Sequence, residues 1–198
     1  NILLDDVDKA LERSGSCFVR YADDMNVYVR SVRAGERVMA RLRKLFSDLH
    51  LQINEDKSAV ADVKTRKFLG FTIMHGKEKV WVQVSPQAAQ RFKDRIREET
   101  KPTRGRSLED VIEQLRRWMP GWRAYFAMPE SSPSTFRELD SWIRRRLRAF
   151  VLRQWRWGRV MYHELLKRDV NTHWVTLVAR HASSYWANSR HSAVHLAF

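Results

Sequence analysis

Two adjacent carboxylates, Asp23 and Asp24, lie between two short runs of residues that are typical of β-strands. Aspartate is uncommon in strands, and neighbouring carboxylates repel each other unless a cation lies close by. At a hairpin tip such a pair can bind Mg²⁺, which takes one or two carboxylates together with substrate phosphates. Two such ions about 4 Å apart lower the pKa of an attacking hydroxyl and stabilise a leaving pyrophosphate. A tight turn without catalytic function is the alternative, since aspartate tolerates turn geometry.

The elements that would position this hairpin alternate between helix and strand. Helical spacing of apolar residues predicts helices over residues 2–13 and 34–49. The apolar face of the second consists of Val38, Leu42, Leu45, Phe46 and Leu49. Short strands are expected over residues 51–53, 68–73 and 80–84. These patterns predict that the first part of the chain is α+β.

Beyond residue 84 the apolar period becomes helical. Ser85 followed by Pro86 indicates a helix start, because proline at the first helical position lacks only a donor that would be unpaired anyway. Ser107 is expected to cap a second helix, and Ser132 with Pro133 to open a third. The last residues, from about 158, also show helical spacing. We therefore predict two domains, an α+β part over residues 1–84 and an all-helical part over residues 85–198.

The charge is concentrated in the helical part. The 198 residues contain 37 Lys and Arg against 23 Asp and Glu, which gives a net charge of +14 and implies a polyanionic partner. Of this charge, +3 falls on residues 1–84 and +11 on residues 85–198. Seven of the eight tryptophans also lie beyond residue 84. Most of them have the spacing of core residues, so we do not expect them to act as base-stacking platforms.

Several classes of protein are disfavoured. The single cysteine, Cys17, excludes a disulfide framework and fits a reducing, intracellular setting. The seven histidines lack metal-ligand spacing, which argues against a zinc site. No apolar run approaches the roughly 20 residues that span a bilayer, so no membrane association is expected. The chain also begins without a methionine, and we expect it to be part of a longer parent protein.

The residues Tyr21-Ala22-Asp23-Asp24, flanked by hydrophobic residues, resemble the catalytic box of reverse transcriptases. The segments that follow keep the order of that family. "LQINEDKSAV" resembles the next reverse-transcriptase block, and "RKFLGF" resembles the primer-grip hairpin. "SLEDVIEQLRRWMPGWRAYF" and "FRELDSWIRRRLRAFVLRQW" are similar to the maturase-specific thumb region of bacterial group II intron-encoded proteins. The resemblance covers nearly the whole chain, and it implies a partial palm over residues 1–84 and a thumb over residues 85–198.

The resemblance also implies roles for individual residues. Asp23 and Asp24 would be catalytic ligands of Mg²⁺, with Mn²⁺ as a substitute, and Tyr21 and Ala22 would line the nucleotide and primer-end site. Lys57 would lie near the incoming triphosphate and donate a proton to pyrophosphate. The residues that would position the primer strand are Phe68, Leu69 and Gly70. For some of these a structural reading stays open: Tyr21 as a cross-strand aromatic, Lys57 as a solvated loop lysine and Gly70 as a bulge.

One departure from the family concerns the metal site. Its members carry a further metal-binding aspartate on an earlier palm strand, after the fingers segments, and neither is present in this sequence. Asp5, Asp6 and Asp8 fall on the predicted first helix, and we interpret them as solvated surface acids. We therefore expect the 198 residues alone not to polymerise. The sequence also ends without a His-Asn-His nuclease pattern.

Two functions remain in competition at this point. The first is an RNA-directed DNA polymerase, a nucleotidyltransferase that uses an RNA template, a DNA primer and deoxynucleoside triphosphates, and assists group II intron splicing and mobility. The second is a non-polymerising maturase module that binds intron RNA. The intact Asp23-Asp24 pair favours the first, and the +11 region serves both. A palm-type nucleotidyl cyclase or an unrelated metal hydrolase is a third option, in which the basic helical region would have no role.

The third predicted helix carries a candidate RNA-binding face. On a helical wheel Arg137, Arg144, Arg145 and Arg148 lie together, opposite the apolar stripe. Arginine matches phosphate oxygens with its planar fork and stays charged at any relevant pH. Arg146 falls at the edge of the stripe and is expected to lay its stem along the core. The alternative is an ordinary solvated charged face.

Overall fold

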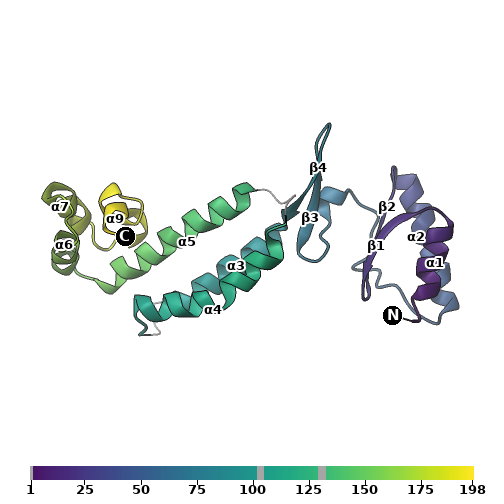
Figure 1. The fold of residues 1–198 in the computed structure, drawn as a ribbon, viewed down its shortest axis with the longest axis horizontal. Helices are drawn as coiled ribbons and strands as arrows, with labels where there is room; N and C mark the ends of the chain where they lie inside the picture. The colour runs from purple at the N-terminus through teal and green to yellow at the C-terminus, as the bar shows by residue number, and fades with distance from the viewer. Residues whose placement is uncertain (1, 102–104, 129–132) are drawn as a thin grey trace. The chain divides into compact units, whose positions relative to one another are not determined.

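The fold was derived from a computed structural model, which describes residues 2–101, 105–128 and 133–198. The chain forms two compact units, unit 1 over Asn1–Val80 and unit 2 over Trp81–Phe198. Figure 1 shows the order of the elements along the chain. Strands occur near the start and helices dominate the rest, which confirms the α+β class and the change to helix. No helix in the described part of the chain is long and apolar enough to cross a membrane.

Unit 1 contains a two-stranded sheet covered by two helices. Its elements are α1 (Asp5–Arg13), β1 (Cys17–Tyr21), β2 (Asp24–Tyr28) and α2 (Val32–Asp48). Both helices contact the sheet, α1 through β1 and α2 through β2. The buried side chains of α1 are Val7, Ala10 and Leu11. A two-stranded sheet is marginally stable in water, so this helical cover is what makes the hairpin a fixed element.

A long irregular segment follows α2 and returns to a second small sheet. It contains one short 3₁₀ helix, η1 (Val63–Thr65), before β3 (Phe71–His75) and β4 (Val80–Val84), which pair with each other. The expected strand over residues 51–53 is wrong, because that stretch has no regular structure and no partner strand. The expected strand over residues 68–73 begins only at Phe71.

Three helices of unit 2 share one apolar core. They are α3 (Pro86–Glu99), α4 (Leu108–Phe126) and α5 (Pro133–Gln154). Ser85 caps α3 as expected, since its side chain accepts from the amide of Ala88 at 3.2 Å. Ser107 caps α4 in a reciprocal capping box with Asp110. The expected cap Ser132 lies outside the described residues. The core consists of Phe92, Ile96, Val111, Leu115, Leu139, Ile143, Phe150 and Val151.

The last four helices pack around a second apolar cluster, to which α5 contributes Leu152. They are α6 (Gly158–Leu166), α7 (Thr172–Arg180), α8 (Tyr185–Asn188) and α9 (Ser192–Ala197), which confirms the helical reading of this segment. The cluster consists of Leu152, Met161, Leu165, Val170, Val175, Val178, Ala193 and Val194. Trp155 packs against both clusters of unit 2. Because α8 contacts α5, the C-terminal segment covers a second side of that helix.

Candidate functional site

The two aspartates lie at the tip of the β1–β2 hairpin. The register pairs Tyr21 with Asp24, so Ala22 and Asp23 form a two-residue turn. Ala22 has a φ of 55°, the left-handed conformation that tight hairpin turns use. Asp23 therefore occupies the turn and Asp24 begins β2, and both are exposed. Within the described residues neither carboxylate makes a hydrogen bond or an ion pair, so no structural partner competes for their oxygens.

The hairpin has one covered and one open face. Directly opposite residues of an antiparallel pair project from the same face, so Tyr21 and Asp24 share one, next to Val19 and Asn26. This face is the open one, since Tyr21 is 64% exposed and Val19 is 40% exposed. Tyr21 thus lies beside a carboxylate on a solvent-accessible surface. Such an arrangement can receive a substrate.

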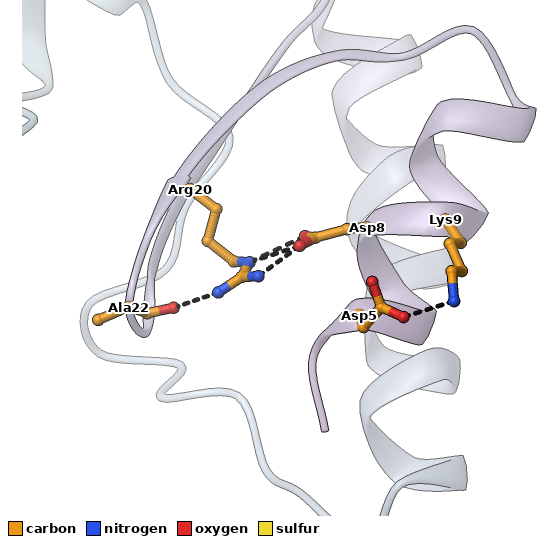
Figure 2. A network of polar contacts seen from close by, with 5 residues as sticks. All are labelled: Asp5, Asp8, Lys9, Arg20 and Ala22. Carbon is orange, nitrogen blue, oxygen red and sulfur yellow. Dashed lines mark hydrogen bonds and ion pairs between the residues drawn. The ribbon is translucent and has the colours of Figure 1, made fainter. Parts of the chain in front are cut away.

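An ion pair that we did not expect from the sequence holds the turn in place (Figure 2). Arg20, on the covered face, donates from Nε to both carboxylate oxygens of Asp8, at 2.8 and 3.0 Å, and from Nη1 to the carbonyl of Ala22 at 2.8 Å. The hydrogen bond with Asp8 raises the pKa of Arg20. Asp8 is therefore not a solvated acid, as we had interpreted it, but the residue that links α1 to the turn.

The sequence does contain a signal for this contact. Alternation along β1 places Arg20 on the same face as Phe18, which faces the helices. An arginine on a covered face requires an acceptor, and Asp8 follows the buried Val7 on α1. Asp5 behaves differently, because it forms an exposed pair with Lys9 at 2.5 Å along the helix.

The pair of aspartates fits part of a magnesium site. Exposed carboxylates are the hard oxygen ligands that Mg²⁺ uses. No group of three or more His, Cys, Asp or Glu side chains that could hold a metal is found in the described part of the chain. Asp23 and Asp24 can therefore supply two ligands. Water, substrate phosphates or a further acid would have to supply the rest.

Lys57 lies in the irregular segment after α2. Its amide closes a turn on Asn54, and its carbonyl accepts a hydrogen bond from Arg66 at 2.5 Å. Arg43 of α2 anchors the same segment through Glu55, with distances of 2.8 and 2.7 Å. The backbone of Lys57 is thus fixed, whereas its side chain is exposed and forms no bond with Asp23 or Asp24 in the described structure.

Phe68, Leu69 and Gly70 form a tight turn. Phe68 and Phe71 exchange both backbone hydrogen bonds, at 2.8 and 2.9 Å. Leu69 and Gly70 both have positive φ, 51° and 82°. Because a second positive φ in succession strongly favours glycine, Gly70 is part of a turn and not a bulge. The turn presents Leu69, which is 37% exposed.

The arginines of α5 lie in three environments and do not form the single exposed face that we expected. Arg137 and Arg144 are exposed, and Arg144 donates from Nε to Asp140 at 2.9 Å. Arg145 is half-buried, with its guanidinium 3.8 Å from the centroid of the Trp186 ring. It also donates to the Trp186 carbonyl at 3.1 Å. Burial lowers the pKa of Arg145.

Arg148 does not belong to the exposed arginine face that the sequence predicts on α5. Only 9% of the residue is exposed. Its Nε donates to the carbonyl of Ser189 at 3.1 Å, and its Nη2 lies 3.1 Å from Nε2 of His195. Burial lowers the pKa of Arg148, and the charge of Arg144 adds to this effect. Arg148 therefore joins α5 to the C-terminal segment. Arg146 packs as expected: it is half-buried and donates to Thr100 Oγ1 at 2.8 Å.

Comparison with known families identifies two segments of the chain. Residues 1–73 match the family described as reverse transcriptase (RNA-dependent DNA polymerase). Residues 89–170 match the family described as group II intron, maturase-specific domain. The chain belongs to the group II intron reverse transcriptase/maturase family. A search of curated proteins gave no match.

The two matched segments of this reverse transcriptase/maturase contain every site residue predicted from the sequence. The match over residues 1–73 includes the Asp23-Asp24 hairpin, Lys57 and the Phe68–Gly70 turn. The match over residues 89–170 includes all of α5 with its arginines, and it extends into the second apolar cluster as far as Val170. The chain thus contains a segment of a polymerase family followed by a segment of an RNA-processing family.

Proposed function

We propose that the chain provides the C-terminal part of a polymerase palm, residues 1–84, and a helical thumb with maturase function, residues 85–198. The protein that contains it would be an RNA-directed DNA polymerase of the bacterial cytoplasm that also assists splicing and mobility of its group II intron. Its partners would be intron RNA, an RNA template with a DNA primer, and deoxynucleoside triphosphates. The two family matches support both halves of this proposal.

One observation carries the polymerase half of the proposal. Asp23 and Asp24 are exposed at a rigidly supported hairpin tip and have no structural partner among the described residues. Adjacent like charges cost stability unless a cation compensates for them. A module that only binds RNA would gain nothing from such a pair, so the geometry favours a polymerase over the non-polymerising alternative.

The residues divide the work as follows. Asp23 and Asp24 would hold Mg²⁺, or Mn²⁺ in its place. The metal, when bound, would activate the primer hydroxyl and stabilise charge on the triphosphate. Tyr21 and Ala22 would line the nucleotide and primer-end site. Lys57 would donate a proton toward pyrophosphate, which its exposed side chain on an anchored backbone permits. Phe68, Leu69 and Gly70 would position the primer strand.

The arginines of α5 would contribute unequally to RNA binding. Arg137 and Arg144 are accessible to RNA phosphates, and Arg145 retains a partly exposed guanidinium stacked on Trp186. Arg148 would act on RNA only through the fold of the C-terminal segment. The +11 charge of residues 85–198 would supply the sequence-independent part of RNA affinity.

The test separates polymerisation from RNA binding. It uses the full open reading frame that contains this chain, as wild type and as the Asp23→Asn, Asp24→Asn double variant. We expect the variant to lose DNA synthesis on an RNA template and to retain affinity for the intron RNA and splicing activity, because the hairpin tip contributes little to the core. Synthesis at the wild-type rate would overturn the polymerase assignment. Loss of RNA affinity together with synthesis would show that the tip serves binding.

A further inference from the structure

The corner between α5 and α6 holds one residue in a constrained position. Arg156 has a φ of 42°, a left-handed conformation that costs energy for a residue other than glycine. Just beyond it the amide of Trp157 donates to the carbonyl of Trp155. Gly158 follows, and a Cβ at this position would lie 2.5 Å from the carbonyl oxygen of Ala179. The backbone on both sides of Trp157 is therefore fixed.

The side chain held in this way does not pack into the core. Trp157 is 65% exposed, although tryptophan is on average a highly buried residue. Its neighbour Trp155 packs against both apolar clusters of unit 2. The described ring contact of Trp157 is with Arg156, whose guanidinium lies 5.3 Å from the ring centroid. A strained turn that presents an open indole ring contributes little to stability, which points to a ligand.

A basic cavity lies at the same corner. It has a volume of about 470 Å³ and is lined by Gly105, Arg106, Phe150, Arg153, Gln154 and Arg156. Gln154 fixes one wall by donating from Nε2 to the carbonyl of Arg106 at 2.7 Å. Arg106 is paired with Glu99 at 2.7 Å, and Arg153 lies 5.1 Å from the centroid of the Tyr185 ring. Between Asp140 and Glu164 the sequence has seven arginines and no acid. The corner therefore favours an anion.

These features together match one kind of ligand. Guanidinium groups bind phosphate oxygens, and an exposed indole stacks on a nucleobase. Bases within a duplex are already stacked on each other, so an indole platform selects an unpaired base. We propose that this corner binds an unpaired nucleotide of RNA, with a phosphate in the arginine-lined cavity and the base on Trp157. This inference rests on the proposed function, since it specifies how the maturase part, residues 85–198, binds its RNA.

The stacking half is tested by fluorescence anisotropy on the 198-residue chain. The probes are a single-stranded RNA of about 12 nucleotides, the DNA strand of the same sequence, and a blunt RNA duplex. Trp157→Ala should weaken single-stranded RNA binding about tenfold and leave duplex binding unchanged. Trp157→Phe should restore most of the affinity, because phenylalanine also offers a π-face. Trp174→Ala, which removes another exposed tryptophan, is the matched control and should bind as wild type.

The phosphate half is tested by the salt dependence of the same binding. Arg156→Gly removes the guanidinium and keeps the positive φ, so the fold should persist, as circular dichroism would show. The slope of log affinity against log salt should flatten by about 0.7 for each phosphate of the single strand that the variant no longer binds. Arg180→Ala, an exposed arginine outside the cavity, should leave the slope unchanged.

Each outcome assigns or overturns the site. Wild-type affinity of Trp157→Ala for single-stranded RNA, or an equal decrease for strand and duplex, would overturn the inference while leaving the proposed function intact. A decrease confined to the DNA strand would overturn the assignment to RNA. Absence of all RNA binding by the wild-type chain would instead count against the proposed function itself.

Discussion

The contrast between Arg148 and Arg144 can be tested by the same substitution at both positions. The two residues lie one turn apart on α5, yet Arg148 is buried against the C-terminal segment and Arg144 is exposed. Replacing either by methionine removes one positive charge and keeps an unbranched stem. A surface role and a structural role therefore predict opposite outcomes for the two variants.

The magnitude for Arg148→Met follows from the groups that would be left without their donor. The residue Ser189 is fully buried, and its carbonyl accepts from Arg148 Nε. Leaving a buried acceptor unpaired costs about 1–3 kcal/mol. Removing the buried charge offsets part of this cost, but only part, because the guanidinium reaches His195 at the protein surface and is not fully desolvated. A net destabilisation of about 1–2 kcal/mol should lower the melting temperature of the 198-residue chain by roughly 2–8 °C.

Two measurements on the 198-residue chain check this reasoning. Thermal unfolding followed by circular dichroism should show the drop for Arg148→Met and almost no change for Arg144→Met. RNA binding as a function of salt should show the reverse, with the slope flattened by about 0.7–0.9 for Arg144→Met alone. An unchanged melting temperature for Arg148→Met, together with a flattened slope, would refute the structural role and restore the single exposed arginine face.

Three further outcomes follow from the structure. Asp8→Asn in the full open reading frame should slow primer extension about tenfold and raise the Mg²⁺ concentration needed for half activity. The reason is that Arg20 no longer holds the turn that carries Asp23. An unchanged Mg²⁺ dependence would argue against a positioning role for Asp8. Ser85→Ala should lower the free energy of unfolding of the chain by about 1 kcal/mol in urea denaturation, since the amide of Ala88 loses its cap. Burial lowers the pKa of His195 in the folded state, and the charge of Arg148 adds a smaller effect. As the pH drops, the unfolded state therefore binds a proton at this histidine before the folded state does. Stability should then fall as the pH drops through the ordinary histidine pKa. His195→Gln should reduce the difference in stability between about pH 7.5 and about pH 5.5, and an unchanged difference would contradict this assignment.

The elements that local chemistry specifies were predictable from the sequence. Ser85 with Pro86 and Ser107 mark the starts of α3 and α4, because a cap depends on residues within one turn. The hairpin with Asp23 and Asp24 at its tip follows from strand-forming residues on both sides of a turn. These signals require no knowledge of distant contacts.

Most of the errors concern features that depend on a distant partner. Residues 51–53 have strand composition, but no strand lies beside them, and Arg43 and Glu55 hold the segment as a loop instead. Leu69 and Gly70 interrupt the expected strand because two positive φ angles form a turn. Arg148 lies opposite the apolar stripe of α5, yet the helix is covered on that side too by the C-terminal segment. A helical wheel gives the faces of a helix but not what packs on them.

The proposed RNA-directed DNA polymerase requires Asp23 and Asp24 as metal-binding carboxylates. The most direct measurement is single-turnover primer extension on an RNA template, with Asp23→Asn and Asp24→Asn made separately in the full open reading frame. Asp48→Asn, an exposed acid at the end of α2, is the matched control. Each hairpin variant should slow extension at least about a hundredfold at saturating Mg²⁺, while the control keeps the wild-type rate. Extension at the wild-type rate by both hairpin variants would show that Asp23 and Asp24 do not bind the catalytic metal.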